Sequence, residues 1–243
     1  MRSPGVILRG VVPETRIVLY GPRGLPLTEK VGRGLRVKGF AFTLEEPKSP
    51  EDYRRMSPET GLLPVLDVDG ERVPDSVAIL DFLDERFPEP AFVASDARVA
   101  REQRGLERWM DQTFSFHMLR WIRSRVGDPS LQRAPGGGFP LGPLSQLGAI
   151  GPGGQLRRDL FDARSGGPGP EFERSLDHLR QLLAARPYFF ADHLSRADLS
   201  VYAGLALLCR ELYEGSRGLL DARPPLLAHV ERVAEATGGM EAV

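Results

Sequence analysis

The most informative segment of the sequence runs from Gly61 to Asp84 and reads G-L-L-P-V-L-D-V-D-G-E-R-V-P-D-S-V-A-I-L-D-F-L-D. Asp69-Gly70 between two β-rich runs predicts a hairpin that joins strands at 65–69 and 71–73. The apolar residues that follow recur at helical spacing, which predicts a helix over 76–87.

Two residues of this stretch are unusual for plain packing. Pro64 precedes the first strand, where it removes a ladder donor and is tolerated only at a strand's first residue or at an edge. Ser76 lies at the start of the helix, where unpaired N–H groups and the positive end of the helix dipole favour an anion. The pattern therefore predicts a site for a small peptide that carries a carboxylate.

This combination resembles the cytosolic glutathione transferase superfamily. Leu63-Pro64 stands where the family has its cis-proline motif, and Asp75-Ser76 matches the family's acidic-or-glutamine plus serine pair. Ala78-Ile79 and Phe82-Leu83 follow as in the family. The resemblance implies that Leu63 and Pro64 bind the cysteinyl backbone of glutathione, that Ser76 holds its γ-glutamyl carboxylate, and that Asp75 faces its ammonium. The alternative reading of Asp75-Ser76 is a helix cap alone, and the two roles are compatible.

The preceding residues complete a thioredoxin-like domain at 16–88, as the resemblance implies. Arg16 to Tyr20 predicts a first strand, 28–38 a helix with Thr28 as its N-cap, and 40–44 a second strand. Pro47 and Pro50 indicate an irregular bridge before the hairpin. Residues 1–15 are expected to be a leader without periodicity.

The rest of the chain predicts helices only. After a linker at 89–95, an all-helical domain is expected over 96–243, with a Gly/Pro-rich insertion at 129–170. Ser195-Arg196-Ala197-Asp198 is a capping box, a folding signal that the family also carries. The helices expected in this domain lie at 98–125, 171–185, 195–211 and 226–236, with a further helical piece at 155–164.

Composition excludes several classes of protein. The chain has 243 residues, a net charge of −1 and interspersed charges, so no basic stripe indicates a nucleic-acid partner. Its one cysteine, Cys209, lies in an apolar run and excludes an intrachain disulfide, which favours a reducing, cytoplasmic location. The longest apolar run is too short to span a membrane. The four histidines lack ligand spacing, so no metal site is expected.

The catalytic residue is where the sequence departs from the family. Family enzymes stabilise the glutathione thiolate with a hydroxyl or thiol after the first strand, and the zeta-like pattern places Leu25 and Leu27 at those positions. Two hydroxyls remain as candidates. Tyr20-Gly21-Pro22-Arg23-Gly24 loosely resembles the Y-x-P-x-R-G of tyrosine-type enzymes, and Thr28 lies at the helix start. A third possibility is that no hydroxyl acts.

The expected activity follows from the resemblance. The chain should bind glutathione as a co-substrate and activate its thiol for attack on a small hydrophobic electrophile, as a homodimer without nucleic-acid or membrane partners. The electrophile would lie against loop 21–27, the Gly/Pro-rich segment at 129–170, and the helix that carries Phe114, Phe116, His117 and Arg120. Two alternatives remain: a non-catalytic interaction module with the same fold, favoured by Leu25 and Leu27, or a specialised glutathione-dependent lyase or isomerase.

Overall fold

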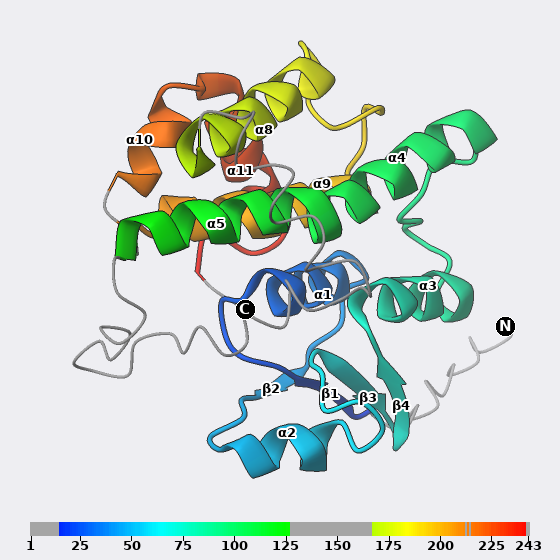
Figure 1. The fold of residues 1–243 in the computed structure, drawn as a ribbon. Helices are drawn as coiled ribbons and strands as arrows, with labels where there is room; N and C mark the ends of the chain where they lie inside the picture. Colours follow the sequence, from blue (N-terminus) through cyan, green and yellow to red (C-terminus); the bar gives the residue numbers. More distant parts are fainter. Residues whose placement is uncertain (1–14, 127–166, 212, 214, 242–243) are drawn as a thin grey trace, which may run out of the picture.

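The computed structural model of the chain describes residues 15–126, 167–211, 213 and 215–241. A small sheet with its helices lies below a larger group of helices (Figure 1). The first unit contains β1 (Ile17–Tyr20), α1 (Pro26–Val37), β2 (Thr43–Glu45), α2 (Pro50–Met56), β3 (Val65–Val68), β4 (Glu71–Pro74) and α3 (Ser76–Arg86). The second contains α4 (Ala97–Trp109), the π-helical turn η1 (Met110–Phe114), α5 (Ser115–Val126), α8 (Pro168–Leu183), α9 (Arg196–Cys209), α10 (Ser216–Asp221) and α11 (Pro224–Ala236).

The strands form one mixed sheet in the order β2-β1-β3-β4, with β1 and β2 parallel and the other pairs antiparallel. Side chains alternate between its two faces. Leu19 and Leu66 pack toward α1 and α3, whereas Val18 and Tyr20 pack with Met56 of α2. In Figure 1, α1 and α3 lie between the sheet and the helical unit, and α2 covers the opposite face. The α/β unit followed by helices confirms the predicted fold class.

The first helix starts earlier than the sequence predicts. Its N-cap is Leu25 and Pro26 occupies the first helical position, where a fixed φ and a missing N–H are both tolerated. Thr28 is therefore inside the first turn, and the prediction that it is the N-cap is wrong. Its side chain instead packs on Gly21. A Cβ added at Gly21 would lie only 2.4 Å from the Thr28 hydroxyl oxygen.

Helix α2 replaces the predicted irregular bridge. Ser49 accepts a hydrogen bond from the Asp52 amide while the Asp52 carboxylate accepts one from the Ser49 amide, a reciprocal capping box. Pro50 follows the cap at the first helical position and so starts the helix instead of breaking it. The Ser-Pro-Glu-Asp order carried this signal in the sequence.

Other boundaries differ for similar reasons. The second strand is Thr43–Glu45 and not 40–44, because Phe40 packs edge-on against Phe87 at the end of α3. Pro168 starts α8 inside the predicted insertion, and α10 was not predicted. The predicted leader up to residue 14 and the helical piece at 155–164 lie outside the described residues.

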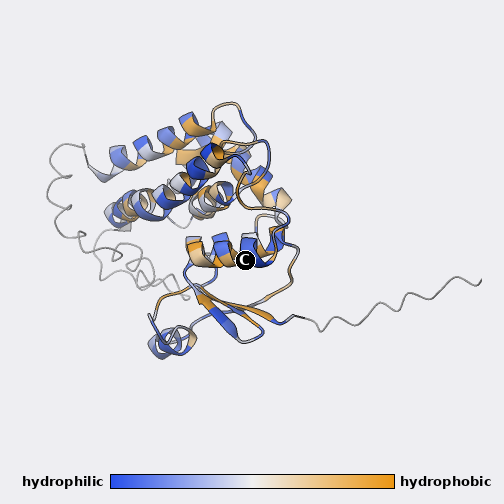
Figure 2. Cartoon of the chain, turned by 90° about the vertical axis from the view of Figure 1, so that its right-hand side faces the viewer, coloured by the Kyte–Doolittle hydropathy of each residue, from blue (hydrophilic) through white to orange (hydrophobic). Residues whose placement is uncertain are grey.

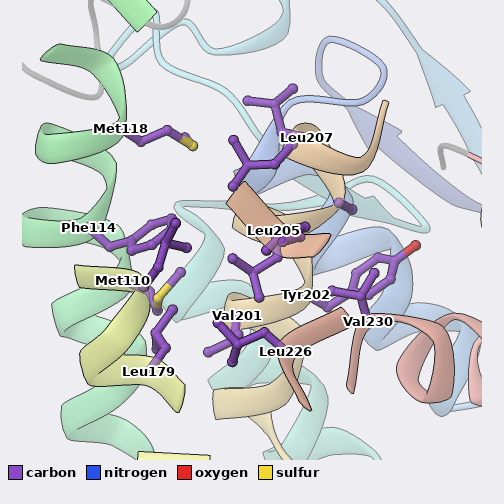
Figure 3. Packing of buried hydrophobic residues seen from close by; sticks show 14 of the residues in the cluster. Met110, Phe114, Met118, Leu179, Val201, Tyr202, Leu205, Leu207, Leu226 and Val230 are labelled. Carbon is purple, nitrogen blue, oxygen red and sulfur yellow. The ribbon is translucent and has the colours of Figure 1, made fainter. Parts of the chain in front are cut away.

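The predicted long helix is present as α4, η1 and α5 in succession, with the Ser115 hydroxyl donating to the Met110 carbonyl at 2.9 Å. Phe114 and Met110 point from it toward α9 (Figure 3). Gly204 permits this contact, since an added Cβ would lie 2.9 Å from the Met110 methyl carbon. The ribbons in Figure 2 alternate between hydrophilic and hydrophobic segments, which is typical of helices with one buried face.

Candidate functional site

The loop before β3 has the backbone geometry that the resemblance implies. The peptide bond between Leu63 and Pro64 is cis. The Pro64 carbonyl accepts a hydrogen bond from the Asp75 amide at 3.3 Å, which ties this loop to the start of α3. Within the described residues, the backbone N–H and C=O of Leu63 have no hydrogen-bond partner. They are therefore available to an extended peptide, as in strand addition.

Asp75 and Ser76 form the start of α3. Asp75 is the N-cap, and its carboxylate accepts hydrogen bonds from the amides of Val77 at 2.8 Å and Ala78 at 3.1 Å. It does so at a φ of 72°, in a region that few residues with a Cβ adopt. The cap leaves the Ser76 amide and hydroxyl without a partner among the described residues. These two donors lie where the helix dipole favours a carboxylate.

Tyr20 lies beside the cis-proline loop. It ends β1 opposite Val65, is 6% exposed, and belongs to the apolar cluster against which Leu63 packs. The guanidinium of Arg72 stacks over its ring, with the central carbon 5.2 Å from the ring centroid. The structure thus brings Tyr20 and Leu63 together on the α2 side of the sheet.

The start of α1 is apolar. Leu25 occupies the N-cap, so no side chain accepts a hydrogen bond from the first-turn amides. Pro26 has no amide hydrogen, which leaves those of Leu27 and Thr28 at the positive end of the helix. The Thr28 side chain is 1% exposed and packs on Gly21, away from open solvent. A negative charge at this terminus would therefore meet backbone dipoles and no hydroxyl from Leu25 or Leu27.

A buried network of charges joins α1 to the helical unit. Lys30 donates to Glu107 at 3.2 Å and to Asp111 at 2.8 Å. Burial favours the neutral amine, but the two carboxylates outweigh it and raise the pKa of Lys30, so the side chain is charged. Arg196 of α9 also donates to Glu107 and reaches Asp81 of α3. These contacts fix α1 and α3, whose N-termini form the site, against α4 and α9.

Residues 19–91, which contain the cis-proline loop and the start of α3, match the family model of the glutathione S-transferase N-terminal domain. The whole fold is similar to that of a glutathione S-transferase from Rhodospirillum rubrum, with a TM-score of 0.61 and 22% identity over 91% of this chain and 88% of that one. Residues 19–91 thus match a glutathione S-transferase N-terminal domain, and the chain as a whole has the glutathione transferase fold.

Further solved structures share this glutathione transferase fold. One is a glutathione S-transferase from Methylobacterium radiotolerans in complex with glutathione sulfonate, with a TM-score of 0.62 and 21% identity over 93% of this chain and 96% of that one. Another is a beta-etherase from Sphingobium, with a TM-score of 0.65 and 20% identity over 92% and 98% of the two chains. None of the curated proteins compared with the chain matches it.

The helical unit of the chain contributes less to the site than the sequence indicates. Phe114 is fully buried and packs against Phe172, so it belongs to the core and not to an open wall. His117 is half-buried and its Nδ1 lies 2.7 Å from the Ser175 hydroxyl. Arg120 pairs with Glu171 at 2.7 Å. Cys209 is half-buried against the helical core, and burial raises the pKa of its thiol, which favours the unreactive protonated form.

No group of three or more His, Cys, Asp or Glu side chains in the described residues is placed to hold a metal ion. None of the helices in that part of the chain is long and apolar enough to cross a membrane.

Sequence reasoning missed the buried charges Lys30, Glu107 and Arg196. No local pattern in the sequence marks them as partners. Lys30 and Glu107 are separated by 77 positions in the chain. The one signal was Gly34, a turn after Lys30, because a glycine in a helix interior often marks a close helix contact. An added Cβ at Gly34 would lie 2.7 Å from a Leu80 carbon of α3.

Proposed function

We propose that the chain binds glutathione at the cis-proline loop and the start of α3. The observation that carries this proposal is the shared geometry of Leu63 and Ser76. The hydrogen bond from the Asp75 amide to the Pro64 carbonyl fixes the unpaired backbone of Leu63 beside the unpaired amide and hydroxyl of Ser76. A peptide with an extended backbone and a free carboxylate complements both sets of groups.

Calorimetric titration tests this proposal. Glutathione should bind the wild type, and Ser76→Ala should weaken binding about tenfold to a hundredfold because a hydrogen bond to a charged group is lost. Ser124→Ala on α5 is the matched control, since its hydroxyl donates within its own helix to the Trp121 carbonyl. It should bind like the wild type. No binding to the wild type would contradict the proposal.

We further propose that the bound thiol attacks a small hydrophobic electrophile. The N-terminus of α1 supports this step, because its free amides and dipole lower the pKa of a nearby thiol. The activity requires that the pKa of bound glutathione fall below the ordinary value of a free thiol, which is about 8.5. Ultraviolet absorbance of the bound thiolate against pH measures it directly.

The rival function is a non-catalytic binding module with this fold. Leu25 favours it, because the residue at the helix start offers no hydroxyl to a thiolate. A module of this kind would bind glutathione without lowering its thiol pKa, or would not bind it. The absorbance of the bound thiolate against pH therefore separates the two functions. A glutathione-dependent lyase or isomerase requires the lowered pKa as well and differs only in the products it forms.

Assembly and location belong to the same proposal. We propose a homodimer by analogy with the family, and sedimentation equilibrium of the purified chain decides it through the measured mass. We propose a cytoplasmic location because Cys209 has no partner cysteine in the sequence and the chain needs no oxidising compartment.

A further inference from the structure

Arg210, at the end of α9, reaches across to the start of α1. One of its terminal nitrogens, Nη1, donates to the Gly24 carbonyl at 2.8 Å, and the other, Nη2, donates to the Glu29 carboxylate at 3.0 Å. Gly24 precedes the N-cap Leu25, and Glu29 is the residue whose amide makes the first helical hydrogen bond to the Leu25 carbonyl. The guanidinium of Arg210 therefore contacts the chain on both sides of Leu25, the residue that stands where the family has its serine or cysteine.

Two guanidinium groups share one buried carboxylate at this contact. Glu29 is 1% exposed, and Arg33 meets it from one side at 2.8 Å and Arg210 from the other at 3.0 Å. The other acceptors of Arg33 are backbone carbonyls of 237–241 and the Thr237 hydroxyl, all neutral. Tyr202 also faces this pair. Burial raises the pKa of its hydroxyl, so it stays neutral.

A second arginine, Arg23, lies in the loop itself and is placed differently. Arg23 donates from both its amide and its side chain to Glu46, at 3.0 Å and 3.2 Å, and its side chain is 52% exposed. Its charge is therefore offset by a carboxylate and screened by solvent. Arg210 is only 21% exposed, and the carboxylate it meets is shared with Arg33. Of the two, Arg210 acts more strongly on the start of α1.

We propose that Arg210 is a positioning residue that fixes the loop at Gly24 and stabilises the glutathione thiolate at the start of α1. This inference rests on the proposed function. The helical unit would then supply, through one guanidinium, the stabilisation that Leu25 cannot give. The bond to Gly24 holds the loop in place, and the charge lowers the energy of the thiolate relative to the thiol.

Three variants separate the charge from the hydrogen bonds. Arg210→Gln removes the charge and keeps an amide donor, while Arg210→Lys keeps the charge but cannot form two bonds in the fixed geometry of a guanidinium. Arg98→Met is the matched control, because Arg98 is 81% exposed and forms an ion pair with Glu102 one turn away on α4. For each protein, calorimetry gives the glutathione affinity and thiolate absorbance gives the bound thiol pKa. The rate at which iodoacetamide alkylates bound glutathione, followed by the thioether product, gives its reactivity.

We expect Arg210→Gln to raise the bound thiol pKa by about one unit while the affinity changes less than about threefold. Arg210→Lys should keep the thiol pKa near the wild-type value but slow alkylation several-fold, because lysine cannot keep both the bond to Gly24 and the bond to Glu29. A wild-type thiol pKa and alkylation rate in both variants would overturn the inference and leave the proposed function intact. If Arg210→Gln does not fold, an unchanged alkylation rate in Arg210→Lys overturns it. Failure of the wild type to bind glutathione would overturn both.

Discussion

Asp75 caps α3, and by the proposed function it also faces the ammonium of glutathione. Substitution can separate these two roles. Asp75→Ala removes the acceptor for two helix amides, which costs about 1 kcal/mol. It also leaves alanine at a φ of 72° and a ψ of 129°, a conformation that the two lost hydrogen bonds help to hold, which costs about 1 kcal/mol more. The sum of about 2 kcal/mol predicts a fall in melting temperature of roughly 4–8 °C for a chain of this size.

Asp75→Asn should behave differently. Asparagine caps a helix as well as aspartate and tolerates a positive φ, so its stability should stay within about 0.5 kcal/mol of the wild type. It lacks the charge that the ammonium of glutathione would meet. Loss of one exposed ion pair, at about 1 kcal/mol, predicts glutathione binding weaker by roughly fivefold. Thermal unfolding and calorimetric titration of the same samples measure the two effects.

Asp96 offers the control for the strained backbone. It caps α4 with the same pattern, accepting from the amides of Arg98 and Val99, but at an ordinary φ of −70°. Asp96→Ala should therefore destabilise the chain less than Asp75→Ala. Equal destabilisation would show that the positive φ is not a source of strain. An Asp75→Asn variant as unstable as Asp75→Ala would refute the capping argument, and unchanged affinity in it would refute the contact with the ammonium.

The remaining predictions concern packing, pH and the candidate hydroxyl. Gly34→Ala should destabilise the chain by about 1–3 kcal/mol, because the new Cβ would lie 2.7 Å from a side-chain carbon of α3. Gly105→Ala, with nothing within 4 Å, should stabilise α4 by about 1 kcal/mol, and denaturant unfolding compares the two. Burial lowers the pKa of His229 to about 4, so the stability that its neutral ring contributes is lost as the pH falls from about 6.5 toward that value. The unfolding free energy of the wild type should therefore drop by about 3 kcal/mol relative to His229→Phe over this range. Asp198 lies 3.7 Å from His229, and burial raises its pKa to about 6. Because Asp198 is present in both proteins, the comparison isolates the effect of His229. Tyr20→Phe should raise the bound thiol pKa if Tyr20 activates glutathione, and an unchanged thiolate absorbance would remove it as a candidate.

The sequence predicts elements whose signals are local. The hairpin at Asp69-Gly70 needs only a turn pair between two β-rich runs, and the structure has both strands within one residue of the predicted bounds. The capping box at Ser195 and Asp198 is likewise contained in four residues, and the Ser195 hydroxyl donates to the Asp198 carboxylate at 2.7 Å. α2 was missed although its signal was equally local, because Pro50 was interpreted as a breaker rather than as the first residue of a helix.

The contacts that join the two units could not be predicted in this way. Lys30, Glu107 and Arg196 read as ordinary charged residues on amphipathic helices, and only the packing of α1 against α4 and α9 makes them partners. Buried ion pairs of this kind add little net stability but are costly to break, by about 3–5 kcal/mol. They therefore specify how the units are oriented, which no local pattern records.

The same distinction applies to catalysis. The residue before a helix is a local feature, so the sequence identifies Leu25 as the departure from the family and leaves the start of α1 without a side-chain donor. Whether that departure abolishes thiol activation depends on what else faces the helix start, and Arg210 lies 186 positions from the carbonyl it contacts. A hydroxyl stabilises a thiolate through one hydrogen bond, whereas a guanidinium acts through its charge over several ångströms and needs no direct contact. Loss of the hydroxyl at position 25 is therefore not sufficient reason to infer loss of activity. The bound thiol pKa in wild type and Arg210→Gln is the quantity that distinguishes an enzyme with a relocated stabilising group from a fold that only binds.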